Sequence, residues 1–202
     1  MKLNQSHTIK ALLLFLILVV VNILSFYFFE RFDLTEDNRY TLSPAAVEIV
    51  EDVQKPLNIE VFLKGEFPAE FRKLQFETRQ ILEEFAAHNP NIKFSFINPL
   101  KDGGNTGAVA SRFYEMGMTP ARINVVENGR SSETIVFPWA VVHYNGNSDP
   151  VQLLINTLGA TRQERITASV QQLQYAFADA FSKLVYPKRK KIAVMRGNGE
   201  LP

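Results

Sequence analysis

The side chains that could carry chemistry are few and widely spaced in this sequence. The chain of 202 residues contains no cysteine, which excludes disulfides, thiolate metal sites and cysteine nucleophiles. Its three histidines, His7, His88 and His143, do not share a helix or strand face at the spacing of metal ligands. Glu83 and Glu84 are adjacent and project to different sides of a helix, which favours a solvated surface over an acid–base pair.

Two short motifs also fall short of a catalytic pattern. Ser131–Ser132 has no histidine placed near it by the sequence, and Gly197–Asn198–Gly199 lacks the rest of a phosphate-binding fingerprint. We therefore predict that the protein is not an enzyme and that it binds no metal and no cofactor.

The charge balance argues against nucleic acid as a partner. The net charge is +1, and every acidic residue lies from Glu30 onward. Lys2 and Lys10 precede that point, which leaves 20 basic and 21 acidic residues in the rest of the chain. A nucleic-acid binder needs a clustered basic surplus for phosphate contacts, which this balance does not provide. The basic run Lys188–Lys191 could contact an anionic surface, but a soluble linker is the favoured interpretation.

An uncharged segment dominates the N-terminal region. Ala11–Phe29 is apolar except for Asn22 and Ser25, and as a helix it would be about 28 Å long, close to the thickness of a bilayer core. A cleaved signal peptide would have a shorter apolar run and small residues at its end, whereas this run ends in bulky aromatic residues. The pattern predicts an uncleaved transmembrane helix over residues 11–29, with residues 1–10 in the cytoplasm. Asn22 within it could bond a neighbouring helix or its own backbone.

Residues 30–55 read as a juxtamembrane neck followed by a helix. Ser43 is a suitable N-cap and Pro44 suits the first helical position. In the neck, Phe32, Leu34, Arg39 and Tyr40 are the candidate contacts with a partner protein. The alternative is that the apolar members of this group pack against the helix that follows.

Residues 56–185 alternate between strand and helix patterns. Apolar residues at every second position predict strands, and apolar stripes at helical spacing predict helices. The expected strands are 57–63, 92–96, one beginning near 123, 134–144 and a short one at 151–155, and the expected helices begin near 44, 68, 109 and 166. Asn128–Gly129 predicts the turn of a hairpin between the third and fourth strands.

This order resembles the thioredoxin-like fold. After the first helix the elements read β-α-β-α-β-β-α, and Gly117–Gly129 (GMTPARINVVENG) is similar to the stretch in which a cis proline precedes the third strand. Pro120 would be that proline, with a cis bond before it; ordinary Gly–Pro punctuation before a strand is the alternative. The redox cysteines of that fold are missing at the first strand–helix junction. Of the functions of thioredoxin-like domains, this chain could therefore retain binding but not redox chemistry. The candidate peptide or ligand loops hold Gly65 and Pro68, and Thr119 and Pro120; simple turns at the strand edge are the alternative.

The most specific sequence feature is Arg31–Pro44 (RFDLTEDNRYTLSP). Together with the preceding apolar segment, it resembles the start of the GldG-type auxiliary proteins of ABC transporters, which are associated with gliding motility in Bacteroidetes. The strand at 56–63, the FPAEFRKLQ helix start, FINP and KIAVMRGNGE fit the same pattern.

The resemblance implies a protein of the inner membrane with most of its chain in the periplasm. It implies an accessory subunit that works with an ABC permease and, through it, a cytoplasmic ATPase. A periplasmic peptide- or ligand-binding receptor domain is the alternative function. Members of that family continue into a second region, so residues 186–202 are expected to be a linker and the start of that region, cut short in a fragment.

Overall fold

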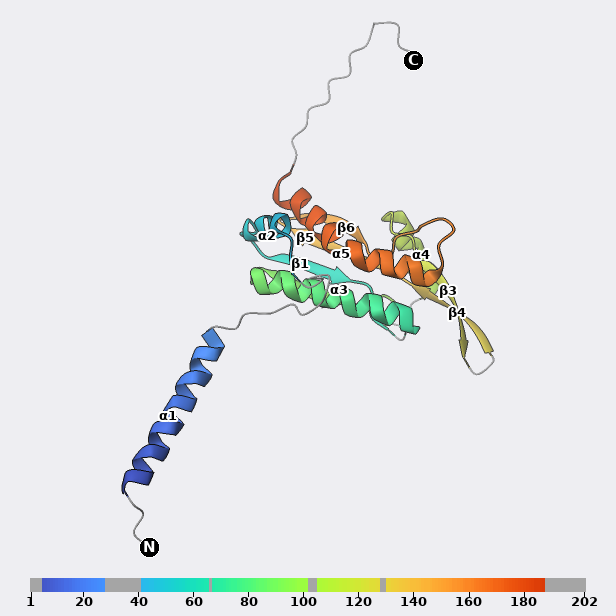
Figure 1. Ribbon diagram of the computed structural model, residues 1–202. Coiled ribbons are helices and arrows are strands. Elements are labelled where there is room, and N and C mark those ends of the chain that lie inside the picture. Colours follow the sequence, from blue (N-terminus) through green and yellow to red (C-terminus); the bar gives the residue numbers. More distant parts are fainter. Residues whose placement is uncertain (1–4, 28–40, 66, 102–104, 128–129, 188–202) are drawn as a thin grey trace, which may run out of the picture. The chain divides into compact units, whose positions relative to one another are not determined.

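The computed structural model describes residues 5–27, 41–65, 67–101, 105–127 and 130–187. Contacts divide the chain into two units, Met1–Asn38 and Arg39–Pro202. The described residues form five helices and six strands, a mixed α/β composition (Figure 1).

The first unit contains a single described helix, α1 (Gln5–Tyr27). Its apolar side chains between Ile9 and Ile23 are exposed. Among the residues that the structure describes, no helix is both long enough and apolar enough to cross a membrane. The predicted transmembrane helix over residues 11–29 is therefore wrong. The described helix begins with the polar residues Gln5 to Thr8, and Phe28 and Phe29 of the predicted span lie outside the described residues.

A four-stranded sheet forms the centre of the second unit. Its strands are β1 (Leu57–Val61), β2 (Ile92–Phe96), β5 (Trp139–Tyr144) and β6 (Asn147–Gln152), in the spatial order β2-β1-β5-β6. The strands β1 and β2 are parallel and are connected by α3 (Ala69–His88), which confirms the predicted crossover. The remaining pairs are antiparallel.

The predicted β-α-β-α-β-β-α order, and with it the thioredoxin-like fold class, is wrong. After α2 (Pro44–Glu51) the order is β1-α3-β2-α4-β3-β4-β5-β6-α5, with α4 at Thr106–Glu115 and α5 at Arg162–Val185. The predicted hairpin, β3 (Ala121–Glu127) and β4 (Arg130–Val136), is a separate two-stranded sheet.

Pro138 divides the fourth predicted strand into two strands of different sheets. The segment predicted as one strand over 134–144 is divided, with its first residues in β4 and residues 139–144 in β5. A proline has no backbone N–H and interrupts a ladder. The chain changes sheets at Phe137 and Pro138, both of which are buried.

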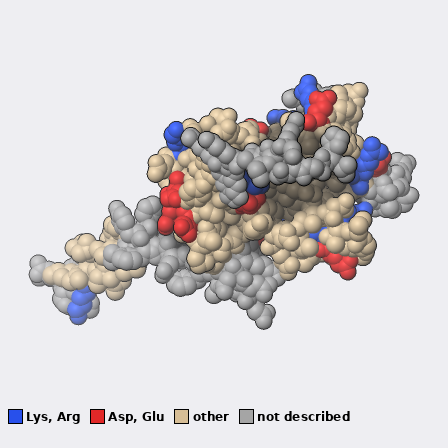
Figure 2. Space-filling model, turned by 90° about the horizontal axis from the view of Figure 1, so that it is seen from above, with Lys and Arg blue, Asp and Glu red and all other residues tan. Residues whose placement is uncertain are grey.

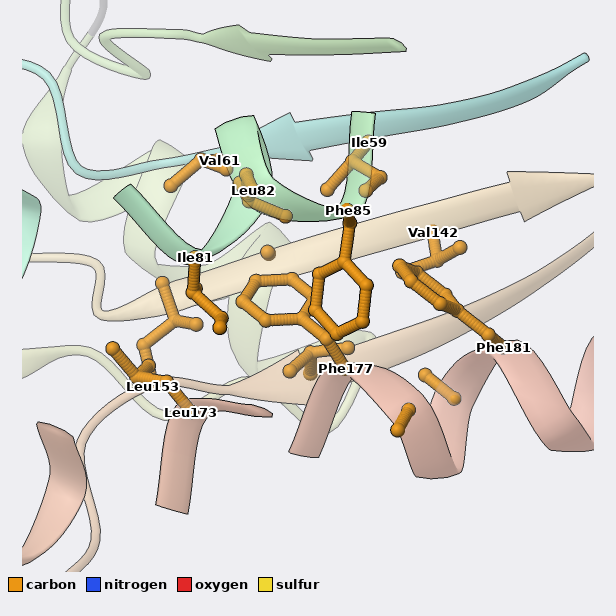
Figure 3. Packing of buried hydrophobic residues seen from close by; sticks show 14 of the residues in the cluster. Ile59, Val61, Ile81, Leu82, Phe85, Val142, Leu153, Leu173, Phe177 and Phe181 are labelled. Carbon is orange, nitrogen blue, oxygen red and sulfur yellow. The ribbon is translucent and has the colours of Figure 1, made fainter. Parts of the chain in front are cut away.

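The main core lies between the sheet and two helices. Alternate residues of β1 point toward α3 and α5, where Phe85, Phe177 and Phe181 fill the space (Figure 3). The ring of Phe85 lies edge-on to both other rings, with centroids 6.5 Å and 5.0 Å apart. The helix α2, capped by Ser43 as predicted, packs against the same two helices.

A second, smaller core joins α4 to the other face of the sheet. It contains Phe113, Met118 and Phe137, and the ring of Phe62 lies 4.9 Å from that of Phe113. This cluster covers only the end of the sheet near Phe62 and Trp139. The polar residues of β1, β2 and β5 on the same face lie outside this cluster and form a separate, open surface.

Candidate functional site

Most of the predicted partner contacts fall in a part of the chain that the structure does not describe. Phe32, Leu34, Arg39 and Tyr40 all lie outside the described residues. Asn22 is described and lies exposed on α1 in the first unit. The partner interface at these five residues therefore stays a prediction.

The loop between β1 and α3 borders a small cavity of about 140 Å³. Gly65 contributes to its wall, together with residues of the β2–α4 loop and of β4. The backbone of Gly65 has φ of 156°, and an added Cβ would lie 3.4 Å from the ring of Phe67. Pro68 is the N-cap residue of α3 and does not line the cavity. Because small-molecule pockets usually measure about 300–1,000 Å³, this cavity is small for a ligand site.

The second predicted loop is separate from that cavity. Neither Thr119 nor Pro120 contributes to its wall. The carbonyl oxygen of Thr119 accepts a hydrogen bond of 2.8 Å from the indole N–H of Trp139, so a backbone group expected to bind a peptide already has a partner. Pro120 is buried, and no cis peptide bond occurs among the described residues, so the cis alternative for Pro120 is wrong.

A broader hollow of about 500 Å³ lies on the open face of the sheet. Its side chains come from alternate positions of three adjacent strands: Asn58 and Glu60 from β1, Lys93 and Ser95 from β2, and His143 from β5. The sequence analysis missed this surface. The signal was present in the polar residues that alternate with the core residues of β1 and β2, but the sheet order was needed to bring them together.

Three side chains in and beside this hollow form a chain of contacts. The Oγ of Ser148 lies 2.8 Å from Nδ1 of His143, and Nε2 of that histidine lies 3.8 Å from Oε2 of Glu60. Ser148 lies opposite His143 on the neighbouring strand β6. The side chains of His143 and Glu60 are 42% and 46% exposed, so water screens their interaction and weakens any activation of the serine hydroxyl. This arrangement is a solvent-exposed polar contact across β1, β5 and β6.

Two titratable groups with raised pKa values lie at the end of α5. A hydrogen bond to the Asp52 carboxylate raises the pKa of Tyr186 to about 12. The side-chain hydrogen bond to Asp179, 2.7 Å long, raises the pKa of Lys183. The Tyr186 bond joins the end of α5 to Asp52 at the end of α2, whereas the Lys183–Asp179 bond lies within α5. On the face drawn in Figure 2, basic and acidic residues are scattered among uncharged ones, without a field of one sign.

The described residues contain no group of three or more histidine, aspartate or glutamate side chains that could hold a metal ion. A groove of about 390 Å³ runs between α2 and α5, lined by small and amide-bearing side chains. Within it, Gln174 donates a hydrogen bond of 2.9 Å to the Ser43 hydroxyl.

The second unit is thus a mixed α/β domain that carries, among its described residues, an open hollow on the sheet and a groove between α2 and α5. Residues 36–143 match a family described as a domain of unknown function, DUF7088. Since these residues make up more than half of the chain, the protein belongs to this family. The match runs from the neck to the last residue but one of β5. No curated protein and no solved structure matches the chain.

Proposed function

We propose that this protein is a non-catalytic accessory subunit of an ABC transporter complex, linked to gliding motility. Its partners would be an ABC permease and, through the permease, a cytoplasmic ATPase, with this chain on the periplasmic side of the inner membrane. We assign attachment to the complex to contacts between this chain and the permease.

The main support for the proposal is the sequence segment Arg31–Pro44 (RFDLTEDNRYTLSP). Its likeness to the GldG-type auxiliary proteins is the most specific feature of the sequence. The site chemistry is compatible with a binding role, because the contacts among Ser148, His143 and Glu60 are exposed to solvent.

The alternative, a periplasmic receptor for a peptide or small ligand, has less support. It would use the loops at Gly65–Pro68 and Thr119–Pro120. The cavity beside Gly65 measures about 140 Å³ and excludes the second loop, so the two loops do not form a shared pocket.

Affinity purification of the full chain from mild detergent, in the organism that encodes it, tests the proposal. The expected result is recovery of a multi-span ABC permease together with its ATPase, identified by mass spectrometry. Recovery of the chain without either subunit, after chemical cross-linking in intact cells, would contradict it. A parallel purification with an unrelated tagged protein of the same compartment controls for nonspecific capture.

A further inference from the structure

The two edges of the four-stranded sheet differ in their free backbone groups. In the parallel pair, the amide of Leu57 donates to the carbonyl of Asn91, and the amide of Ile97 donates to the carbonyl of Val61. Successive residues of a strand point their N–H and C=O groups to opposite sides. Residues 91, 93, 95 and 97 therefore face β1, whereas Ile92, Phe94 and Phe96 face the outer edge.

Most of these outward groups lack a partner. The amide of Ile92 is bonded to the carbonyl of Asn89, 3.0 Å away. The N–H and C=O groups of Phe94 and Phe96 have no hydrogen bond within the described part of the chain. Among the described elements, β2 contacts only β1 and α3. The outer edge of β2 therefore offers two donors, and three acceptors including the carbonyl of Ile92.

The opposite edge, β6, is blocked by a proline. The two-residue turn Asn145–Gly146 has positive φ at both positions, and Tyr144 pairs with Asn147 beside it. Alternation from that closing pair makes Ser148, Pro150 and Gln152 face outward. Pro150 has no N–H, so this edge lacks a donor at its centre, which is a common protection of edge strands. β2 has no such residue.

The side chains along β2 present different surfaces on its two faces. On the helix side lie the half-buried rings of Phe94 and Phe96, with the guanidinium of Arg79 4.4 Å from the Phe96 ring centroid. One turn earlier on α3, Phe76 is 54% exposed. On the other side, Lys93 and Ser95 line the hollow.

Two cations flank this edge without an acidic partner. Neither Lys93 nor Arg79 forms an ion pair within the described residues. The acidic side chain that lines the hollow, Glu60, has its Oε2 atom 3.8 Å from Nε2 of His143. A segment lying along β2 would therefore meet positive charge on both faces and aromatic surface on one of them.

We propose that the outer edge of β2 is a docking site for an extended segment of a partner protein. That segment carries acidic side chains toward Lys93 and apolar side chains toward Phe94 and Phe96, and it adds to the sheet as a fifth strand. Main-chain hydrogen bonds supply the affinity, and the alternating side chains supply the specificity. The inference rests on the proposed function, since it assigns this segment to a subunit of the transporter complex.

The test combines two substitutions with site-specific cross-linking in the full chain. Lys93→Glu reverses the charge at the edge, and Phe94→Pro removes an outward N–H without touching the bonds to β1. The matched controls are Lys101→Glu, an exposed charge outside the edge, and Gln152→Pro, at an outward position of the other edge. We expect each edge variant to lower recovery of the bound subunit by about tenfold and each control by less than about twofold. Circular dichroism melting verifies folding, and Lys93→Glu keeps the test valid if Phe94→Pro unfolds.

A photo-reactive amino acid at Ser95 identifies the occupant, with the same group at Gln152 as the control. Cross-linking from position 95 to an acidic, extended segment of the permease or ATPase complex supports the docking site. Cross-linking to such a segment of an unrelated protein supports the docking site but contradicts the proposed function. Cross-linking to a second copy, or to residues 188–202 of the same chain, overturns the inference. So does full recovery of the permease with both edge variants, although that result would leave the proposed function intact.

Discussion

Asn89 connects three elements through one amide side chain. It is 8% exposed, and its Nδ2 donates hydrogen bonds of 2.8 Å and 3.0 Å to the carbonyls of Val50 and Val53 at the end of α2. Its Oδ1 accepts a bond from the amide of Asn91, just before β2. The sequence shows Asn89 only as the end of a helical stripe, because its partners lie more than thirty residues away.

We predict that Asn89→Ala lowers the free energy of unfolding by roughly 2 kcal/mol, because buried carbonyls lose their hydrogen-bond donors. Urea denaturation followed by circular dichroism measures the change. Asn91→Ala is the matched control, since it removes one half-buried bond to Val53 and should cost about 1 kcal/mol or less. Equal losses in the two variants would contradict this account of Asn89.

Tyr186 provides a prediction about pH. Its hydrogen bond to Asp52 raises its pKa to about 12, above the ordinary value of 10.0. A raised pKa in the folded state means that the stabilisation is complete below pH 10 and is lost as the pH rises through about 12. Ultraviolet titration should resolve one of the six tyrosines with this high pKa. That component should disappear in Tyr186→Phe; its persistence would show that another tyrosine is responsible.

At the scale of the elements, periodicity predicted the helices well. The stripe of apolar residues on α5 was expected to face inward, and Ile166, Leu173, Phe177 and Phe181 are buried. The sheet that each strand joins could not be predicted in the same way. Whether 121–136 joins the main sheet depends on how Pro138 divides a run of residues that all favour strand, and on long-range pairing that no local pattern encodes.

Two aromatic residues on α5 differ sharply in burial. Phe177 is fully buried against Phe85, whereas Tyr175, two positions earlier, is 72% exposed. We predict that Phe177→Ala lowers the free energy of unfolding by about 4 kcal/mol because of lost burial and the cavity left behind. Tyr175→Ala should change it by less than about 0.5 kcal/mol. Thermal or urea unfolding checks both, and similar losses for the two would contradict the assigned packing.

The helix α4 depends on the smaller aromatic cluster. Phe113 contacts the rings of Phe62 and Phe137, with centroid distances of 4.9 Å and 4.4 Å. We predict that Phe113→Ala lowers hydrogen-exchange protection of the α4 amides by about tenfold or more, because few other contacts hold this helix. The amides of β1 and α3 should change by less than about twofold. A uniform loss across the chain would show that the two cores unfold together.

At the scale of the whole molecule, the sequence predicted which segments fold but not the surface they create. The loop residues Gly65 and Thr119 were singled out one by one, and the structure does not bring them into one cavity. The edge of β2 was not predicted, because an edge is a property of the sheet order and not of the strand's own residues. The same holds for the protection of β6 by Pro150, which depends on which side of the strand that proline faces.

We propose that this DUF7088 protein acts by binding other subunits through the open edge of its four-stranded sheet. Amide hydrogen exchange of the full chain, alone and in membranes containing the purified permease and ATPase, tests it most directly. We predict that the amides of Phe94 and Phe96 exchange at least about tenfold more slowly in the complex, while those of Ser148 and Gln152 are unchanged. Unchanged exchange at Phe94 and Phe96, when the permease is demonstrably bound, would contradict it.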